Sequence, residues 1–267
     1  MKAAAGLVVL FAAALPCSAQ PRVINGRLVE RPAAGALAST VRELAAAATE
    51  PSWMAWEAPL QPGKELTCWD NGLREAPASA RLEPPDTFFV FVRAEGRRAE
   101  RVRMFGESCE LDAGGRQVTW LRGVTAAESV AFLSDLSSEE GAPRRVRTGA
   151  LSAIAQHGNP EANHRLLQLA RTAAAPKLRS EALFWVAQRA GQGAAAAITE
   201  AIANDPETDV KKRAVFALSQ LPAAEGVPLL IQVARTNRNP AVRKQAMFWL
   251  GQSNDPRALA FFEEILK

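Results

Sequence analysis

Four similar stretches of eleven residues occur in the sequence, and each begins 32 residues after the start of the one before it. They are VRTGALSAIAQ at residues 146–156, LRSEALFWVAQ at 178–188, VKKRAVFALSQ at 210–220 and VRKQAMFWLGQ at 242–252. No residue is inserted or lost between the copies. A fixed period of this length indicates a stack of similar structural units.

Each copy has apolar residues at i, i+4, i+5 and i+8, which form one face of a helix. Breaks such as Asn159-Pro160 and Asp255-Pro256 fit an N-cap followed by proline at the first helical position. A second set of apolar positions follows: Leu166, Ile198, Leu230 and Phe262, then Leu169, Ala201, Val233 and Ile265. Ala150, Ala182, Ala214 and Ala246 allow the helices to approach closely. One such pair cannot bury its apolar face alone, so the sequence predicts a mainly α fold, an α-solenoid of stacked helix pairs.

The pattern Val-Arg-x-x-Ala-Leu-x-x-Leu, followed by Asn-Asp-Pro-Arg-Ala-Leu, resembles the short HEAT-like repeats of bacterial proteins. It stands here at residues 242–250, with Met247 at the first leucine position, and at 254–259. The resemblance covers residues 125–267, about half of the chain. It implies a solenoid in which the first helix of each pair lines the concave side. The resemblance is specific for the fold rather than for the function.

The first 19 residues have the pattern of a secretory signal peptide. Lys2 precedes a short apolar run at 6–15, and Ala19 provides a small residue before the expected cleavage site. The alternative is a lipoprotein site at Cys17, but Pro16 stands where a small residue is expected. The run is too short to cross a bilayer, and no transmembrane segment is predicted elsewhere. We therefore expect an exported protein, periplasmic or extracellular.

Residues 20–122 are expected to form a small α+β domain, and residues 123–267 the solenoid. A helix is expected at 36–48, a β-hairpin from 87–93 and 100–105 with its turn at 94–97, a third strand at 117–121, and a surface loop at 77–85. Cys68 and Cys109 are the cysteines left in the mature chain, and an even pair in an exported protein favours a disulfide. Two unpaired buried thiols are the alternative.

Chemistry-bearing residues are scarce, and no catalytic, metal or cofactor site is predicted. The two histidines, His157 and His164, are expected in a solvated loop. A net charge of +4, dispersed over the chain, does not favour nucleic acid as a partner. A column of cations 32 residues apart could track an anion or pair with carboxylates such as Asp205 or Asp209, and pairing is favoured. Its members are Arg147, Arg179, Lys211 and Arg243.

A column of aromatic and glutamine residues is the one candidate binding site. On a helical wheel its phenylalanines and glutamines point away from the alanine face, and its two tryptophans lie at the edge of that face. The column therefore either binds a segment of another protein or forms core between repeats. Its members are Phe184, Trp185, Gln188, Phe216, Gln220, Phe248, Trp249 and Gln252.

This column predicts a non-enzymatic scaffold for protein–protein interaction, with a protein or peptide segment as partner. The alternative is an accessory or regulatory subunit of an envelope enzyme, in which the amino-terminal domain binds a ligand. HEAT-like repeats also occur in bilin lyases, but that activity needs nucleophilic or acidic residues where this sequence has Phe and Gln. Incomplete cover of Phe261 and Phe262 in the last helix would allow self-association.

Overall fold

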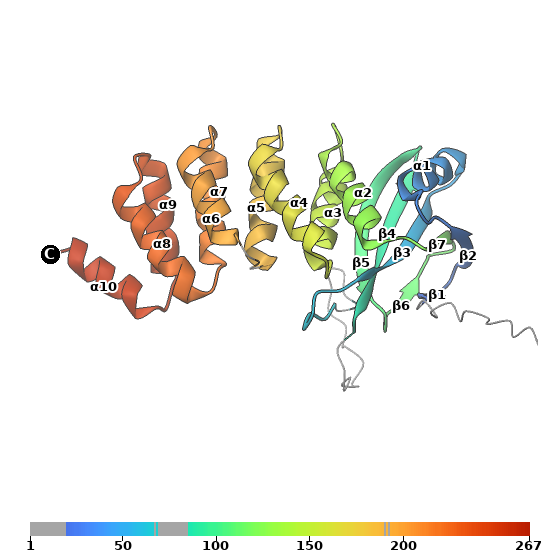
Figure 1. Cartoon of the computed structure of the whole chain (residues 1–267), viewed down its shortest axis with the longest axis horizontal. Coiled ribbons are helices and arrows are strands. Elements are labelled where there is room, and N and C mark those ends of the chain that lie inside the picture. The colour runs from blue at the N-terminus through green and yellow to red at the C-terminus, as the bar shows by residue number, and fades with distance from the viewer. Residues whose placement is uncertain (1–19, 67, 69–84, 190, 192) are drawn as a thin grey trace, which may run out of the picture.

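The computed structural model describes residues 20–66, 68, 85–189, 191 and 193–267. A mixed β-sheet leads into a single row of paired helices (Figure 1). The predicted mainly α solenoid with a small amino-terminal sheet is thereby confirmed. The predicted signal peptide, the alternative lipid site at Cys17 and residues 77–84 of the predicted loop lie outside the described residues.

Five strands form the main sheet, in the order β2-β7-β3-β4-β5. The predicted hairpin is present as β4 and β5, and its turn contains Gly96 and Arg97, both with positive φ. The predicted strand at 117–121 forms β7, which pairs in parallel with β2 and β3 instead of extending the hairpin. A separate parallel pair joins β1 and β6. The strands are β1 Arg22–Ile24, β2 Arg27–Pro32, β3 Ser52–Pro59, β4 Thr87–Glu95, β5 Arg98–Gly106, β6 Glu110–Asp112 and β7 Gln117–Arg122.

The two faces of the sheet are both apolar, because successive side chains of a strand point to opposite sides. Met54 and Trp56 of β3 point toward the helices and belong to the main core. Ala55 of β3 belongs to a second cluster on the other face, with Phe89 and Trp120. The helix predicted at 36–48 is present as α1, Leu37–Ala47.

The helices after the sheet pack in pairs, and the pairs stack in sequence order (Figure 1). The first helix of each repeat unit is α3, α5, α7 or α9, and the second is α4, α6, α8 or α10. The helices are α2 Ala126–Ser138, α3 Arg144–Gln156, α4 Pro160–Thr172, α5 Pro176–Arg189, α6 Ala194–Asn204, α7 Thr208–Ser219, α8 Ala223–Thr236, α9 Pro240–Gly251 and α10 Pro256–Ile265.

The repeat columns lie where the period predicts them. The alanine column has no solvent exposure in any of the four copies, and the columns that begin at Val146 and Ile154 are buried throughout. Asn159 and Asp255 are side-chain N-caps, each followed by proline in the first turn. The starts of α4 and α10 follow from these local signals.

The sheet packs against the first repeat at the position that a preceding repeat would occupy. β5 packs along α3, and a Cβ atom at Gly149 would lie 2.4 Å from the carbonyl oxygen of Val102. One apolar core continues from β3 and β4 through α2 and α3 into the later repeats. β7 ends at Arg122 and Thr125 caps α2, while the division into two domains at residue 122 stays a prediction.

Candidate interaction surface on the first helices

The predicted aromatic column lies on one face of α5, α7 and α9. Phe184 and Phe216 stack with ring centroids 5.9 Å apart and planes 2° from parallel. Trp249 continues the row, 4.8 Å from the Phe216 ring. Phe248 lies against Trp249 at 5.0 Å, and Trp185 lies against Phe184 at 5.1 Å. The structure therefore brings all five predicted aromatic residues together.

Solvent reaches this row from its outer side. Phe184, Trp185, Phe216 and Trp249 are half-buried, and Phe248 is 54% exposed. The three predicted glutamines, Gln188, Gln220 and Gln252, are exposed beside them. The Gln188 side-chain amide donates to the Gln220 side-chain oxygen at 3.3 Å. The rings thus pack between repeats along one edge and face solvent along the other.

Two hollows flank Phe216, and both are lined by Phe216 and Arg213. The hollow toward α3, of about 220 Å³, also has Arg144, Glu181, Phe184 and Trp185 in its wall. The hollow toward α9, of about 520 Å³, also has Asp209, Lys212, Gln245 and Trp249. We call the two hollows and the aromatic row between them the aromatic groove.

Arg147 and Arg179 of the cation column pair with carboxylates, as predicted, whereas Lys211 and Arg243 bond to backbone carbonyls instead. Arg179 donates two hydrogen bonds to the Asp205 carboxylate, at 2.7 and 3.0 Å, and one to the carbonyl of Ala173 after α4. Lys211 and Arg243 donate to the carbonyls of Ala203 and Asn237 at the ends of α6 and α8. Cations at a helix C-terminus satisfy carbonyls that lack an intrahelical partner.

A family model described as HEAT repeats matches residues 195–267, which include α7 to α10. The chain is a HEAT-like repeat protein. Among solved structures, human deoxyhypusine hydroxylase in complex with glycerol is 20% identical, with a TM-score of 0.37 over 51% of this chain and 43% of that chain. The YibA protein of Escherichia coli is 21% identical, with a TM-score of 0.36 over 53% of this chain and 54% of that one.

This HEAT-like protein thus spans about half the length of each of those structures. No curated protein matches its sequence. The family model does not reach residues 20–122, so the sheet has no assigned family. HEAT repeats typically form helical scaffolds for protein interaction.

His157 does not lie in solvent, and the prediction for it was wrong. Its ring is fully buried against Phe88, and its Nε2 lies 2.8 Å from the Ser129 hydroxyl. Its Nδ1 lies 2.8 Å from the carbonyl of Ala153, which can only accept, so Nδ1 carries the proton. Ser129 in turn accepts from the Trp56 indole at 2.8 Å. Burial lowers the pKa of His157 to about 4, so the ring is neutral at pH 7. His164 is exposed, as expected.

A third hollow, which the sequence did not reveal, lies on the face of the sheet away from the helices. It has a volume of about 240 Å³, and Trp53, Phe91 and Phe105 line it together with Arg103 and Glu110. The continuous apolar run after Ser52 was a signal for β3, because a strand buried on both faces has no polar alternation. The position of the hollow depends on how β1 and β6 lie over the sheet, which local pattern does not encode.

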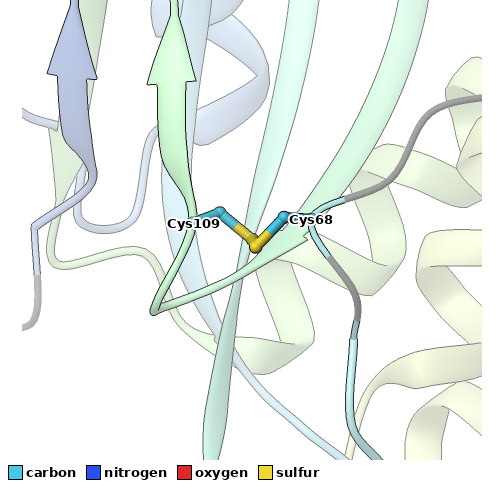
Figure 2. The surroundings of a disulfide bond; sticks show 2 residues. All are labelled: Cys68 and Cys109. Atoms are coloured by element: carbon cyan, nitrogen blue, oxygen red, sulfur yellow. A yellow bond between two sulfur atoms is a disulfide. The ribbon is translucent and has the colours of Figure 1, made fainter. Parts of the chain in front are cut away.

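Cys68 and Cys109 form the predicted disulfide, with their Cα atoms 5.2 Å apart (Figure 2). The bond ties the chain before β6 to the segment that follows β3. Cys68 also borders the hollow on the sheet. Within the described ranges, no cluster of three or more His, Cys, Asp or Glu residues could hold a metal ion. No helix among the residues described is long and apolar enough to span a membrane.

Proposed function

We propose that this protein is a non-enzymatic interaction scaffold that binds a segment of a partner protein along the aromatic groove. The observation that carries the proposal is the row of half-exposed rings that three successive repeats contribute, Phe184, Phe216 and Trp249. A contiguous exposed apolar patch usually marks an interaction site. Aromatic side chains that are already ordered by their neighbours lose little freedom on binding, so they make effective anchors.

The test is the removal of the central ring. Phe216→Ala should weaken partner binding by on the order of 2 kcal/mol while leaving the fold largely intact. Partners captured from an envelope extract by the wild-type protein are identified by mass spectrometry, and their affinity for each variant is then measured. Leu259→Ala, which removes a 63% exposed apolar residue from α10 outside the groove, is the control.

Two results would contradict the proposal. The first is a Phe216→Ala variant that unfolds more easily by the roughly 3–5 kcal/mol typical of a core phenylalanine, which would make the row inter-repeat core. The second is an equal loss of partner binding in the Leu259→Ala variant, which would place the binding surface elsewhere.

The proposal includes export, with cleavage after Ala19 into the periplasm or the extracellular space. The Cys68–Cys109 bond supports it, since structural disulfides persist in oxidising compartments. Intact-mass measurement of the mature protein should show Gln20 as the first residue. A diacylated Cys17 at the amino terminus, or two free thiols in peptide maps of freshly exported protein, would contradict it.

The hollow on the sheet favours a second candidate function, an accessory or regulatory subunit that binds a small ligand there. Its wall of Trp53, Phe91 and Phe105 is apolar with a few charged groups at the edge, as in many ligand sites. Native mass spectrometry of the purified protein should then show a small molecule that is lost in Trp53→Ala and kept in Trp185→Ala. Retention of the molecule in both variants would remove this candidate.

A further inference from the structure

The rim of the aromatic groove carries more positive than negative charge. Its two carboxylates are already paired: Glu181 with Arg147 at 3.0 Å, and Asp209 with Lys212 at 3.2 Å. In the part of the chain that the structure describes, Arg144 and Arg213 on the rim have no ion-pair partner. The rim therefore presents two cations that an acidic ligand could neutralise.

Arg213 occupies the central place in this arrangement. Its guanidinium lies over the Phe216 ring, 5.9 Å from the ring centre, and it lines both hollows. An anion bound to Arg213 would thus sit directly above the aromatic row. Lys244, the residue 32 positions after Lys212, is exposed and adds a further cation on the side of α9. Complementary charge at such a rim guides both association and register.

The aromatic row crosses the helices of three repeats. Its rings lie 5.9 and 4.8 Å apart on α5, α7 and α9, so they form one continuous apolar stripe. A segment that follows this stripe runs across the repeats and places its apolar side chains in the hollows on either side of Phe216.

The glutamine column suits the backbone of such a segment. A polyproline II chain forms no internal hydrogen bonds, so its carbonyls need donors from elsewhere. Gln188, Gln220 and Gln252 are exposed next to the rings, and each amide can both donate and accept. Aromatic-lined grooves are also a common way to bind this conformation.

We infer that the aromatic groove binds an acidic polypeptide segment in an extended, polyproline II-like conformation, with apolar side chains among the acidic ones. This inference rests on the proposed function and specifies the chemistry of its partner. The apolar side chains enter the hollows on either side of Phe216. The acidic side chains between them pair with Arg213 and Arg144.

Three labelled 12-residue peptides test this with the full exported chain by fluorescence anisotropy. The first repeats Leu-Glu-Pro, the second Leu-Lys-Pro and the third Ser-Glu-Pro. The first peptide should bind at least about tenfold more tightly than each of the others, because only it combines acidic charge with apolar side chains. Equal binding of the lysine peptide would overturn the charge argument, and equal binding of the serine peptide would overturn the role of the apolar side chains.

Charge reversal provides the matched variants. Arg213→Glu should weaken the Leu-Glu-Pro peptide by about tenfold or more and improve the Leu-Lys-Pro peptide, since it exchanges attraction for repulsion above the rings. Arg42→Glu makes the same change on an exposed residue of α1 and should leave both affinities unchanged. Unchanged peptide affinities in Arg213→Glu would overturn the inference.

A 12-nucleotide single-stranded oligothymidylate serves as a competitor in the last experiment. If it displaces the Leu-Glu-Pro peptide with similar affinity, the groove recognises negative charge alone and the inference fails. The proposed function fails separately, when no partner protein depends on Phe216. A captured partner that depends on Phe216 but binds Arg213→Glu as well as wild type would keep the function and overturn the acidic-segment inference.

Discussion

The two ends of the helical row are built differently. At the amino end, the backbone of β5 packs against Gly149 of α3, and Ser152 contacts Met104. At the other end, Met247 of α9 is 36% exposed, although Leu151, Leu183 and Val215 in the same column have no exposure. The same repeat position is thus core in three units and surface in the fourth. The contribution of a repeat residue to the stability of the protein therefore depends on whether a further layer covers it.

The covered end is also tied by polar contacts. The hydrogen-bond chain from Trp56 through Ser129 to His157 joins β3, α2 and the end of α3, and every member is buried. Arg189 of α5 donates to the carbonyl of His157 at 2.7 Å, which links the next repeat to the same point. A fully satisfied buried network of this kind favours one arrangement of the sheet on the repeats.

The largest expected difference in unfolding free energy between covered and uncovered positions comes from truncating side chains of the column that contains Leu183 and Met247. Leu183→Ala should lower the free energy of unfolding by about 2–5 kcal/mol, because it leaves a cavity in the core. Met247→Ala, in the same column at the open end, should cost less than about 1 kcal/mol, because solvent already reaches the side chain. Urea unfolding of both variants measures this, and equal losses would show that the end is covered in solution.

The covered end should also be sensitive to acid. The folded pKa of His157, about 4, lies below the ordinary histidine pKa of 6.5, so below pH 6.5 the unfolded chain takes up a proton that the folded chain does not. The contribution of His157 to stability is complete above pH 6.5 and should fall by roughly 3 kcal/mol as the pH drops to 4.

The wild-type minus His157→Gln difference in unfolding free energy, measured from pH 7.5 to 4, isolates this contribution from that of the carboxylates. His164→Gln, at an exposed position, is the control and should keep the wild-type profile. A wild-type minus His157→Gln difference that does not change with pH would mean that the imidazole is not buried.

Alanine substitutions of two glycines, one at each end of the row of helices, give the smallest predicted difference in stability. Gly149→Ala should cost about 1–3 kcal/mol, because its Cβ would meet the backbone of Val102. Gly251→Ala in α9 has nothing within 4 Å of the new Cβ and should stabilise the protein by about 0.5 kcal/mol. Thermal melts report both, and a neutral Gly149→Ala would show that β5 does not pack against α3 in solution.

The sequence predicted those features that depend on local pattern. Ala182 and Ala214 recur in register with their apolar neighbours, so the helix pairs and their stacking follow from the period alone. The turn at Gly96 likewise marks the hairpin. His157 was misplaced because its burial depends on Trp56 and Phe88, about 100 and 69 residues earlier in the chain, and no local signal connects them.

The candidate site shows the same limit. The period placed Phe184 and Phe216 side by side, since residues 32 apart occupy equivalent positions in a stack. It did not show that Arg213 lies above them or that Glu181 is already paired, because those contacts depend on side-chain conformations between neighbouring repeats. The hollow on the sheet was missed for the same reason, as it forms from strands distant in sequence.

The cation column has a consequence for how such a protein can change in length. Arg179, Lys211 and Arg243 each reach back to the end of the helix before their own, so each joins two successive units. An insertion of a few residues in one of those loops would move the cation away from the carbonyls that it satisfies. Deletion or duplication of all 32 residues would restore every contact. Growth or shortening by whole repeats is therefore the tolerated route, and the length of the binding surface would change in the same steps.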